Sequence, residues 1–175
     1  FYFLTSIFFL LTSIYGAYNY FSYIPHWDMW ESYLNFFSRE NLYSFDTWWD
    51  QHNEHRPIIS KFLFWIDLNF FSGEIWFLIT TNYILVSLIC FVFYKFTEDL
   101  NLKNIKWLPY FIIIWMFSFI QKENLTWGFQ SQFFLAYLFP LTSLFFLSRS
   151  TNDKKISNYN FLLSSLFGIL SVFTM

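Results

Sequence analysis

The chain has 175 residues, of which 56% are hydrophobic, 28% aromatic and only 13% charged. This composition excludes an ordinary soluble domain, and a net charge of −2 with a pI of about 5.9 gives no reason to expect nucleic acid as a partner. Several apolar runs reach the length of a membrane span, so we predict an all-α integral membrane protein with about five transmembrane helices.

The first apolar run, residues 1–20, is the first predicted span. Its tyrosine-rich flank is typical of a membrane interface, and no small-residue cleavage site of a signal peptide follows it. The chain begins at Phe1 within this run and ends at Met175 within another, so we interpret it as the N-terminal fragment of a longer protein. The single cysteine, Cys90, cannot form an internal disulfide and gives no indication of the redox compartment.

Residues 21–74 are predicted to form a long extracytoplasmic first loop that contains interfacial amphipathic helices. Within this loop, residues 25–57 hold six of the twelve carboxylates, all three histidines and four of the nine tryptophans. A stretch this rich in titratable and aromatic side chains, between two apolar segments, is where we expect a functional site.

The run of residues 57–73 is apolar enough to resemble a span, but it contains Lys61 and Asp67. A charge near the middle of a bilayer costs roughly 2.5–3.5 kcal/mol on insertion scales, and the spacing of these two charges does not make a helical pair. We therefore predict a helix that lies in the membrane interface or re-enters the bundle, with both side chains reaching water or neighbouring loops.

Four further apolar runs complete the predicted spans, at residues 75–94, 107–120, 128–147 and 161–175. The charges between them support this layout. Two loops that share one side, 95–106 and 148–160, hold six basic residues against three acidic ones, whereas the opposite side holds four basic and nine acidic residues. Because an excess of basic residues marks the cytoplasmic side, residues 25–57 and 121–132 are predicted to face the outside together.

The first candidate site follows the first span directly. Asp28 and Glu31 lie three residues apart and would share one face of a helix at the membrane surface. A carboxylate beside aromatic and apolar surface can have a raised pKa or act as a base, so both are candidate catalytic residues. The alternative is structural, with Asp28 as an acid in the first turn of a helix beside interfacial tryptophans.

The second candidate site lies in residues 48–56. Two histidines three residues apart and nearby carboxylates could bind a divalent metal ion, with ligands drawn from Asp50, His52, Glu54 and His55. Two histidines and unplaced carboxylates do not define a metal geometry. We therefore predict no required cofactor and no metal site.

A phosphate site fits the same stretch better. Histidine, arginine and lysine side chains would form a cationic patch at the depth where the phosphate of a lipid lies, with contributions from His52, His55, Arg56 and Lys61. Glu54 is assigned to the same substrate-binding region. The alternative is a solvated loop that contains an Arg–Glu pair.

The third candidate site is the polar connection at residues 121–132. It offers amide and aromatic side chains of the kind that hold sugar hydroxyls and ring faces, and we assign Trp127 and Gln130 to substrate binding. The alternative is an ordinary helix start, with Asn124 or Thr126 as the cap and an interfacial tryptophan.

The order of these features resembles the GT-C superfamily of polytopic membrane glycosyltransferases. Its members, which include protein mannosyltransferase-like and aminoarabinose transferase-like proteins, have a span, a long outer loop with an acidic residue just after the membrane, and interfacial helices before the next span. More narrowly, the NEHRP sequence at residues 53–57 and the WGFQ sequence at residues 127–130 resemble uncharacterised bacterial membrane proteins grouped near that superfamily.

The resemblance implies transfer of a sugar from a polyprenyl-phosphate-linked donor to an acceptor, at the extracytoplasmic face of a bacterial plasma membrane. Asp28 would match the catalytic acid of the first loop, which deprotonates or binds the acceptor, and His55 and Arg56 would bind the lipid phosphate. The chain lacks the clear Asp–Glu pair of the protein mannosyltransferases. The candidates for a second carboxylate are Glu31, Asp50 and Glu54.

Two other classes of function remain as alternatives: a transporter or flippase-like bundle with a polar gate, and a non-catalytic membrane subunit with a partner-binding loop. A transporter site needs polar or broken helices near the membrane midplane. The second and fourth predicted spans offer only Thr80, Thr81, Asn82 and Pro140 for this purpose.

If the outer loops meet, the candidate sites should form one site. We expect Asp28, His55 and Arg56 to converge on a single cavity at the outer membrane surface, with Trp127 and Gln130 on its wall.

Overall fold

The computed structural model describes residues 1–38, 44–52, 55–100, 102–152 and 158–174. These residues are helical and contain no strand, and an isolated bridge between His52 and His55 is the extended pairing found among them. The prediction of an all-α fold is confirmed. The longer helices are α1 (Tyr2–Tyr20), α4 (Ile58–Phe70), α5 (Trp76–Asp99), α6 (Leu108–Met116), α8 (Ser131–Asn152) and α9 (Asn158–Ser171).

Short helical elements connect the longer helices. The first loop contains a 3-10 turn, η1 (Trp27–Met29), a π-helical turn, η2 (Trp30–Leu34), and the short helices α2 (Asn35–Ser38) and α3 (Phe45–Trp49). The other short elements are η3 (Leu102–Asn104), η4 (Phe119–Gln121), α7 (Lys122–Thr126) and η5 (Gly128–Gln130).

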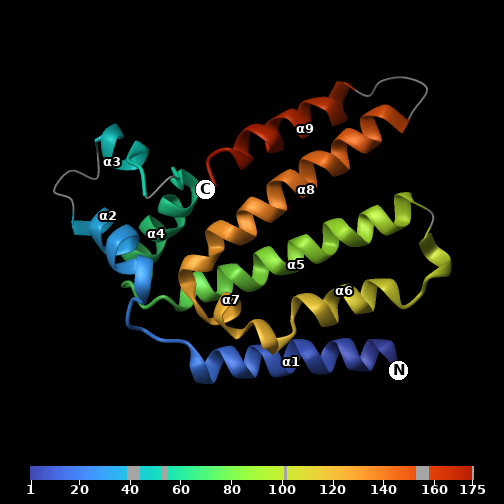
Figure 1. Ribbon diagram of the computed structural model, residues 1–175, viewed down its shortest axis with the longest axis horizontal. Coiled ribbons are helices and arrows are strands. Elements are labelled where there is room, and N and C mark those ends of the chain that lie inside the picture. The colour runs from blue at the N-terminus through green and yellow to red at the C-terminus, as the bar shows by residue number, and fades with distance from the viewer. Residues whose placement is uncertain (39–43, 53–54, 101, 153–157, 175) are drawn as a thin grey trace.

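The long helices lie alongside one another: α5 and α8 run from one end of the bundle to the other, and α1, α6 and α9 run in the opposite direction (Figure 1). α5 contacts α6 and α8, which flank it, while α1 packs against α6 and α9 against α8. The interior is formed by apolar side chains of α5 and α8, among them Val86, Ile89 and Leu138. α5 is therefore the central helix of the bundle.

The connections of the bundle gather at two ends (Figure 1). One end, called here the basic end, comprises residues 95–100 and 102–108, the end of α8 from residue 148 and the start of α9, together with the N-terminus. The other, called the loop end, comprises residues 21–74 and 117–130 as far as they are described. The predicted grouping of polar loops at one end and basic loops at the other agrees with this arrangement.

Two helical segments are long and apolar enough to cross a membrane within the part of the chain that the structure describes: Trp76–Asp99 and Gly128–Thr151. Only 44% and 39% of their apolar windows are buried inside the protein. More than half of each window is therefore not fully buried, whereas the core helix of a soluble protein is mostly buried. The other predicted spans, at residues 1–20, 107–120 and 161–175, do not pass the same test.

The predicted third span is not one continuous helix. α6 has nine residues, which give a length of about 14 Å, whereas the hydrocarbon core of a bilayer is about 30 Å thick. The helix ends at Met116, and the chain continues through η4 and α7 alongside α1. The segment between residues 108 and 126 is therefore a broken helix.

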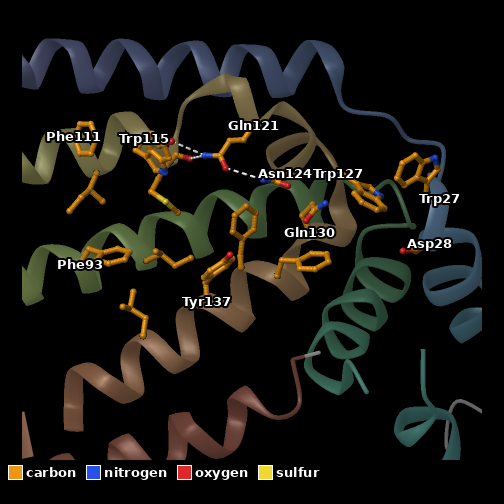
Figure 2. Close-up of a pocket in the computed structure, with 16 residues that line it drawn as sticks. Trp27, Asp28, Phe93, Phe111, Trp115, Gln121, Asn124, Trp127, Gln130 and Tyr137 are labelled. Carbon is orange, nitrogen blue, oxygen red and sulfur yellow. Dashed lines mark hydrogen bonds between the residues drawn. The ribbon is translucent and has the colours of Figure 1, made fainter. Parts of the chain in front are cut away.

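The helix predicted to lie in the membrane interface or to re-enter the bundle, at residues 57–73, is α4. Its 13 residues lie at the loop end, and its axis is turned away from that of α5 (Figures 1 and 2). Of the two alternatives predicted for its charges, water or neighbouring loops, water does not apply, because Lys61 is 5% exposed and Asp67 is fully buried. Both instead bind groups of the first loop, as described below.

Aromatic side chains join the elements of the loop end. The ring of Phe64 on α4 stacks on Phe129 of η5 at 5.9 Å and meets the edge of Tyr33 of η2 at 5.4 Å. All three side chains are fully or almost fully buried. The first loop, α4 and the segment before α8 therefore share one apolar core, which fixes the position of the site.

Candidate functional site

A cavity of about 960 Å³ lies between α5, α6 and α8 (Figure 2). Most of its wall is apolar, because α5 presents Ile89 and Phe93 and α6 presents Phe111 and Trp115. The opposite wall is formed by α8, with Phe133, Phe134, Tyr137 and Leu141. A cavity of this size and lining suits a long hydrocarbon chain.

The cavity becomes polar at the loop end. Two tryptophans, one carboxylate and three amides lie there, and these residues are called the polar mouth: Trp27, Asp28, Gln121, Asn124, Trp127 and Gln130. They come from η1, η4, α7 and η5, so segments about 100 residues apart in the sequence meet at this point. The cavity is therefore amphipathic along its length.

Side chains of the polar mouth also hold the broken helix in place. The amide of Gln121 donates hydrogen bonds to the carbonyl oxygens of Trp115 (3.1 Å) and Met116 (2.9 Å), which are the last carbonyls of α6. Such carbonyls lack a partner within the helix, and an amide donor satisfies them. Asn124 donates in turn to the Gln121 side chain at 3.4 Å.

A buried asparagine on α5 supports the same segment from below. Asn82 is fully buried, and its amide donates to the carbonyl oxygen of Trp127 at 2.9 Å and to that of Asn124 at 3.5 Å. Its own carbonyl oxygen has no hydrogen-bond partner among the described residues. The backbone of the segment from α7 to η5 is thus held by hydrogen bonds from a buried side chain. A hydropathy profile does not reveal such hydrogen bonds.

Asp28 and Gln130 are the polar groups of the mouth most available to a ligand. Asp28 is exposed and points toward the cavity (Figure 2). Gln130 is 9% exposed and lines the cavity, so its amide can meet a ligand there.

The predicted cationic patch does not form at this cavity. Lys61 donates hydrogen bonds to the carbonyl oxygens of Thr47 (3.1 Å), Trp48 (3.2 Å) and Asp50 (2.6 Å), at the C-terminal end of α3. An ammonium group suits that place, because the last carbonyls of a helix carry partial negative charge. The assignment of Lys61 to phosphate binding is therefore corrected: it anchors the first loop to α4.

His55 and Arg56 also lie away from the cavity lining. Arg56 is exposed, and its guanidinium lies 5.2 Å from the centre of the Trp49 ring, a cation–π contact. His52 and His55 exchange two backbone hydrogen bonds, at 2.8 and 2.9 Å, which turn the chain back on itself. Neither His55 nor Arg56 lines the cavity that Asp28 lines, so the predicted convergence of the three on this cavity is not seen.

Glu31 and His52 border a second, much smaller hollow, together with Asp50 and Lys61. Its volume of about 30 Å³ has room for one or two water molecules and not for a phosphate group. The edge of the His52 ring meets Phe129 at 5.8 Å. Glu31 and Asp28, although three residues apart, thus line different spaces.

The metal alternative gains no support from the structure. No group of three or more His, Cys, Asp or Glu side chains with metal-binding geometry occurs among the residues described. Glu54, one proposed ligand and substrate-binding residue, lies outside them. Of the predicted site residues, the cavity brings together Asp28, Trp127 and Gln130.

A buried acid lies beside the site and was not assigned a role. The hydroxyl of Tyr33 donates to the Asp67 carboxylate at 2.6 Å, and both side chains are buried. Burial raises the pKa of Asp67, while the Tyr33 hydrogen bond and the nearby backbone amide of Ile75 oppose that rise. Burial and the neighbouring carboxylate also raise the pKa of Tyr33. This pair fastens the first loop to α4.

A scan against family models and searches of curated proteins and of solved structures return no match for the chain.

Proposed function

We propose that the protein is a membrane glycosyltransferase of the GT-C type, which transfers a sugar from a polyprenyl-phosphate-linked donor to an acceptor. The observation that carries the proposal is the amphipathic cavity. Its apolar length between α5, α6 and α8 suits a long lipid chain, and its polar mouth holds Asp28 together with Trp127 and Gln130. These are the three residues of the predicted site that share one space.

The proposal includes a membrane setting with about five crossings. It is supported by the two long apolar segments of which less than half of each window is buried, Trp76–Asp99 and Gly128–Thr151. It is also supported by the exposed aromatic and aliphatic side chains on α1 and α9, which lipid would cover. The basic end would face the cytoplasm and the loop end the outside of a bacterial plasma membrane, since basic residues gather on the cytoplasmic side.

In the proposed reaction Asp28 acts as a general base. The acceptor hydroxyl would lose its proton to the Asp28 carboxylate as its oxygen bonds to the anomeric carbon of the sugar. The bond from that carbon to the phosphate oxygen would break, and the lipid phosphate would leave with the electron pair. An exposed carboxylate at the end of a lipid-sized cavity is placed for this role.

Arg56 has no part in the proposal, in contrast to the sequence-based assignment. Its guanidinium lies on Trp49, outside the cavity lining, so Arg56→Ala should leave donor binding unchanged. The residues that line the mouth within the described chain include no Lys, Arg or His.

One observation favours a transporter or flippase as the second candidate. The segment between residues 108 and 126 is a broken helix, and the buried amide of Asn82 holds its backbone. Broken helices with exposed backbone groups form the substrate sites of many transporters. In that case the same cavity would carry the lipid across the membrane, and no bond would be made or broken.

The test uses the full chain in proteoliposomes with a radiolabelled polyprenyl-phosphate hexose as donor. Asp28→Asn keeps the shape of the side chain and removes the base, so transfer should fall by about 100-fold or more while donor binding stays within about twofold. Asp46→Asn is the matched control, because Asp46 is an exposed carboxylate on α3 outside the cavity. Equal transfer by both variants would refute the assignment, and lipid movement without transfer would favour the flippase.

A further inference from the structure

We propose that Trp27 and Trp127 form an aromatic corner that binds the ring of a sugar without negative charge, at the polar mouth of the cavity. This inference rests on the proposed function and names the class of head group that the cavity accepts. It assigns a binding role to Trp27, which the sequence marked only as an interfacial tryptophan.

The rings of the two tryptophans meet at nearly a right angle. Their centroids are 6.3 Å apart with an interplanar angle of 85°, and both rings line the cavity. His26 stacks on Trp27 at 5.2 Å, and Phe129 supports Trp127 at 5.4 Å. Two supported aromatic faces at an angle offer a corner into which the apolar face of a sugar ring can pack.

The backbone of Trp27 is held in a conformation that a bulky residue rarely adopts. Its φ is +47°, in the left-handed region, yet its side chain is 72% exposed. Burial of the ring in the protein therefore does not offset the free-energy cost of the strained backbone. Backbone strain of this kind concentrates at ligand sites. Its neighbour Trp30 has an ordinary φ of −64° and does not line the cavity. Trp27 and Trp30, three residues apart, thus differ both in backbone conformation and in whether they line the cavity.

Hydrogen-bonding groups surround this corner. The Gln130 amide offers both donors and an acceptor, and Asp28 offers carboxylate oxygens. Sugar hydroxyls both donate and accept, so they match this combination. Figure 2 shows Gln130, Asp28 and the two tryptophans at the same end of the cavity.

The charge of the mouth selects among sugars. Asp28 is the one ionisable side chain that lines the mouth, and no Lys, Arg or His of the described residues lines the cavity. His26 contacts the rings of Trp27 and Trp127 and lies outside the lining. A sugar carboxylate would therefore meet the Asp28 carboxylate without a cation in the lining, and like charges repel. An uncharged sugar meets no such penalty, so the corner should discriminate against uronic acids.

The experiment measures equilibrium binding of tritiated dodecyl β-glucoside and dodecyl β-glucuronide to the full chain in phosphatidylcholine nanodiscs. The two probes share chain and ring and differ in the carboxylate. We expect the glucoside to bind about tenfold more tightly, and Asp28→Asn to narrow that difference. Trp27→Ala should weaken glucoside binding about tenfold, whereas Trp27→Phe should retain most of it.

Trp30→Ala is the matched control and should bind the glucoside as the unchanged protein does. Binding of dodecanol, which has the chain without the sugar, should not respond to Trp27→Ala, and this excludes a general loss of folding. Equal binding of the two probes, or equal effects of Trp27→Ala and Trp30→Ala, would overturn the inference. Tighter binding of the glucoside than of the glucuronide, without sugar transfer, would refute the proposed function alone. Sugar transfer with equal binding of the two glycosides would refute this inference alone.

Discussion

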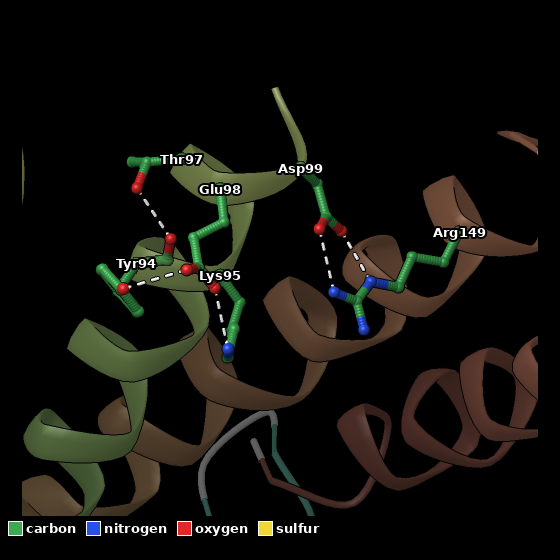
Figure 3. A network of polar contacts seen from close by, with 6 residues as sticks. All are labelled: Tyr94, Lys95, Thr97, Glu98, Asp99 and Arg149. Carbon is green, nitrogen blue, oxygen red and sulfur yellow. Dashed lines mark hydrogen bonds and ion pairs between the residues drawn. The ribbon is translucent and has the colours of Figure 1, made fainter. Parts of the chain in front are cut away.

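The two ends of the bundle use polar residues in different ways. At the basic end, Arg149 of α8 binds Asp99 of α5 through two hydrogen bonds of 2.6 and 2.9 Å, and Lys95 binds Glu98 at 2.8 Å (Figure 3). These side chains are partly exposed, and each charge has its partner. At the loop end, where Asp28 and Arg56 are exposed, other polar side chains are buried and bind backbone carbonyls or each other, as Lys61 and Asn82 do.

The difference shows which polar contacts determine the fold. A charged group in an exposed ion pair exchanges water for its partner, so the pair stabilises the fold only slightly. A buried polar group that loses its partner destabilises the fold by its full desolvation free energy. The loop end should therefore respond strongly to substitution and the basic end weakly. The following predictions test this contrast in order of expected effect.

The largest effect is expected for Lys61→Met. This change removes the donor that satisfies three carbonyl oxygens at the end of α3, so the free energy of unfolding should fall by about 2–4 kcal/mol. Lys95→Met at the basic end is the control and should leave it nearly unchanged, because the Lys95–Glu98 pair is partly exposed to solvent. Denaturant titration in micelles measures both, and equal losses would contradict the contrast between the ends.

A smaller effect is expected for Gly128→Ala. A Cβ at Gly128 would lie 2.9 Å from the Cγ2 of Ile75 and 3.0 Å from the Cβ of Leu78, so η5 would have to move away from α5. Such overpacking costs about 1–3 kcal/mol. Gly168→Ala on α9 meets only an ordinary contact with Ser143, at 3.4 Å, and should be neutral or stabilising. A stabilising Gly128→Ala would show that η5 does not pack on α5 as described.

The Asp67 carboxyl predicts a dependence of stability on pH. Burial raises its pKa above the ordinary 3.8, so the folded protein holds this proton more tightly than the unfolded chain. Its contribution to stability is therefore fully present below about pH 3.8 and is lost as the pH rises through the folded pKa. Asp67→Asn should reduce this loss of stability with rising pH, measured by thermal unfolding at a series of pH values. Asp46→Asn should leave the pH dependence unchanged. A decline that persists in Asp67→Asn would assign it to another group.

The smallest effect is expected at the basic end. Asp99→Asn breaks the pair with Arg149, whose side chain is 42% exposed, so the loss should be about 1 kcal/mol or less. High salt should weaken this contribution further, since it screens exposed charges. A loss as large as that of Lys61→Met would remove the distinction between the two ends.

The fold class and part of the site follow from sequence patterns. Apolar runs mark α5 and α8, and the separation of charges groups the loops at two ends. The same grouping brings Asp28 to Trp127 and Gln130. These features depend on composition along the chain, which the sequence records directly.

The break after Met116 could not be predicted in this way. Three of the residues 117–120 are apolar, so the hydrophobic run continues where the hydrogen-bond pattern changes. Gln121 closes the helix end through its side chain. The burial of Lys61 likewise depends on backbone carbonyl oxygens. Because every residue has such an oxygen, the sequence does not show which ones Lys61 will bind. The left-handed backbone conformation of Trp27 could not be predicted either, because a tryptophan in the sequence gives no indication of a positive φ. Trp27 nevertheless lies next to Asp28, which was predicted as a site residue.

The most direct test of the amphipathic cavity is photolabelling of the full chain in nanodiscs with a benzophenone-bearing polyprenyl phosphate, followed by mass mapping of the adducts. Adducts should concentrate on residues 89–93, 111–116 and 133–141, and an unlabelled polyprenyl-phosphate sugar should suppress them. Adducts that instead fall on the exposed faces of α1 and α9, unaffected by the competitor, would contradict binding of the lipid chain between α5, α6 and α8.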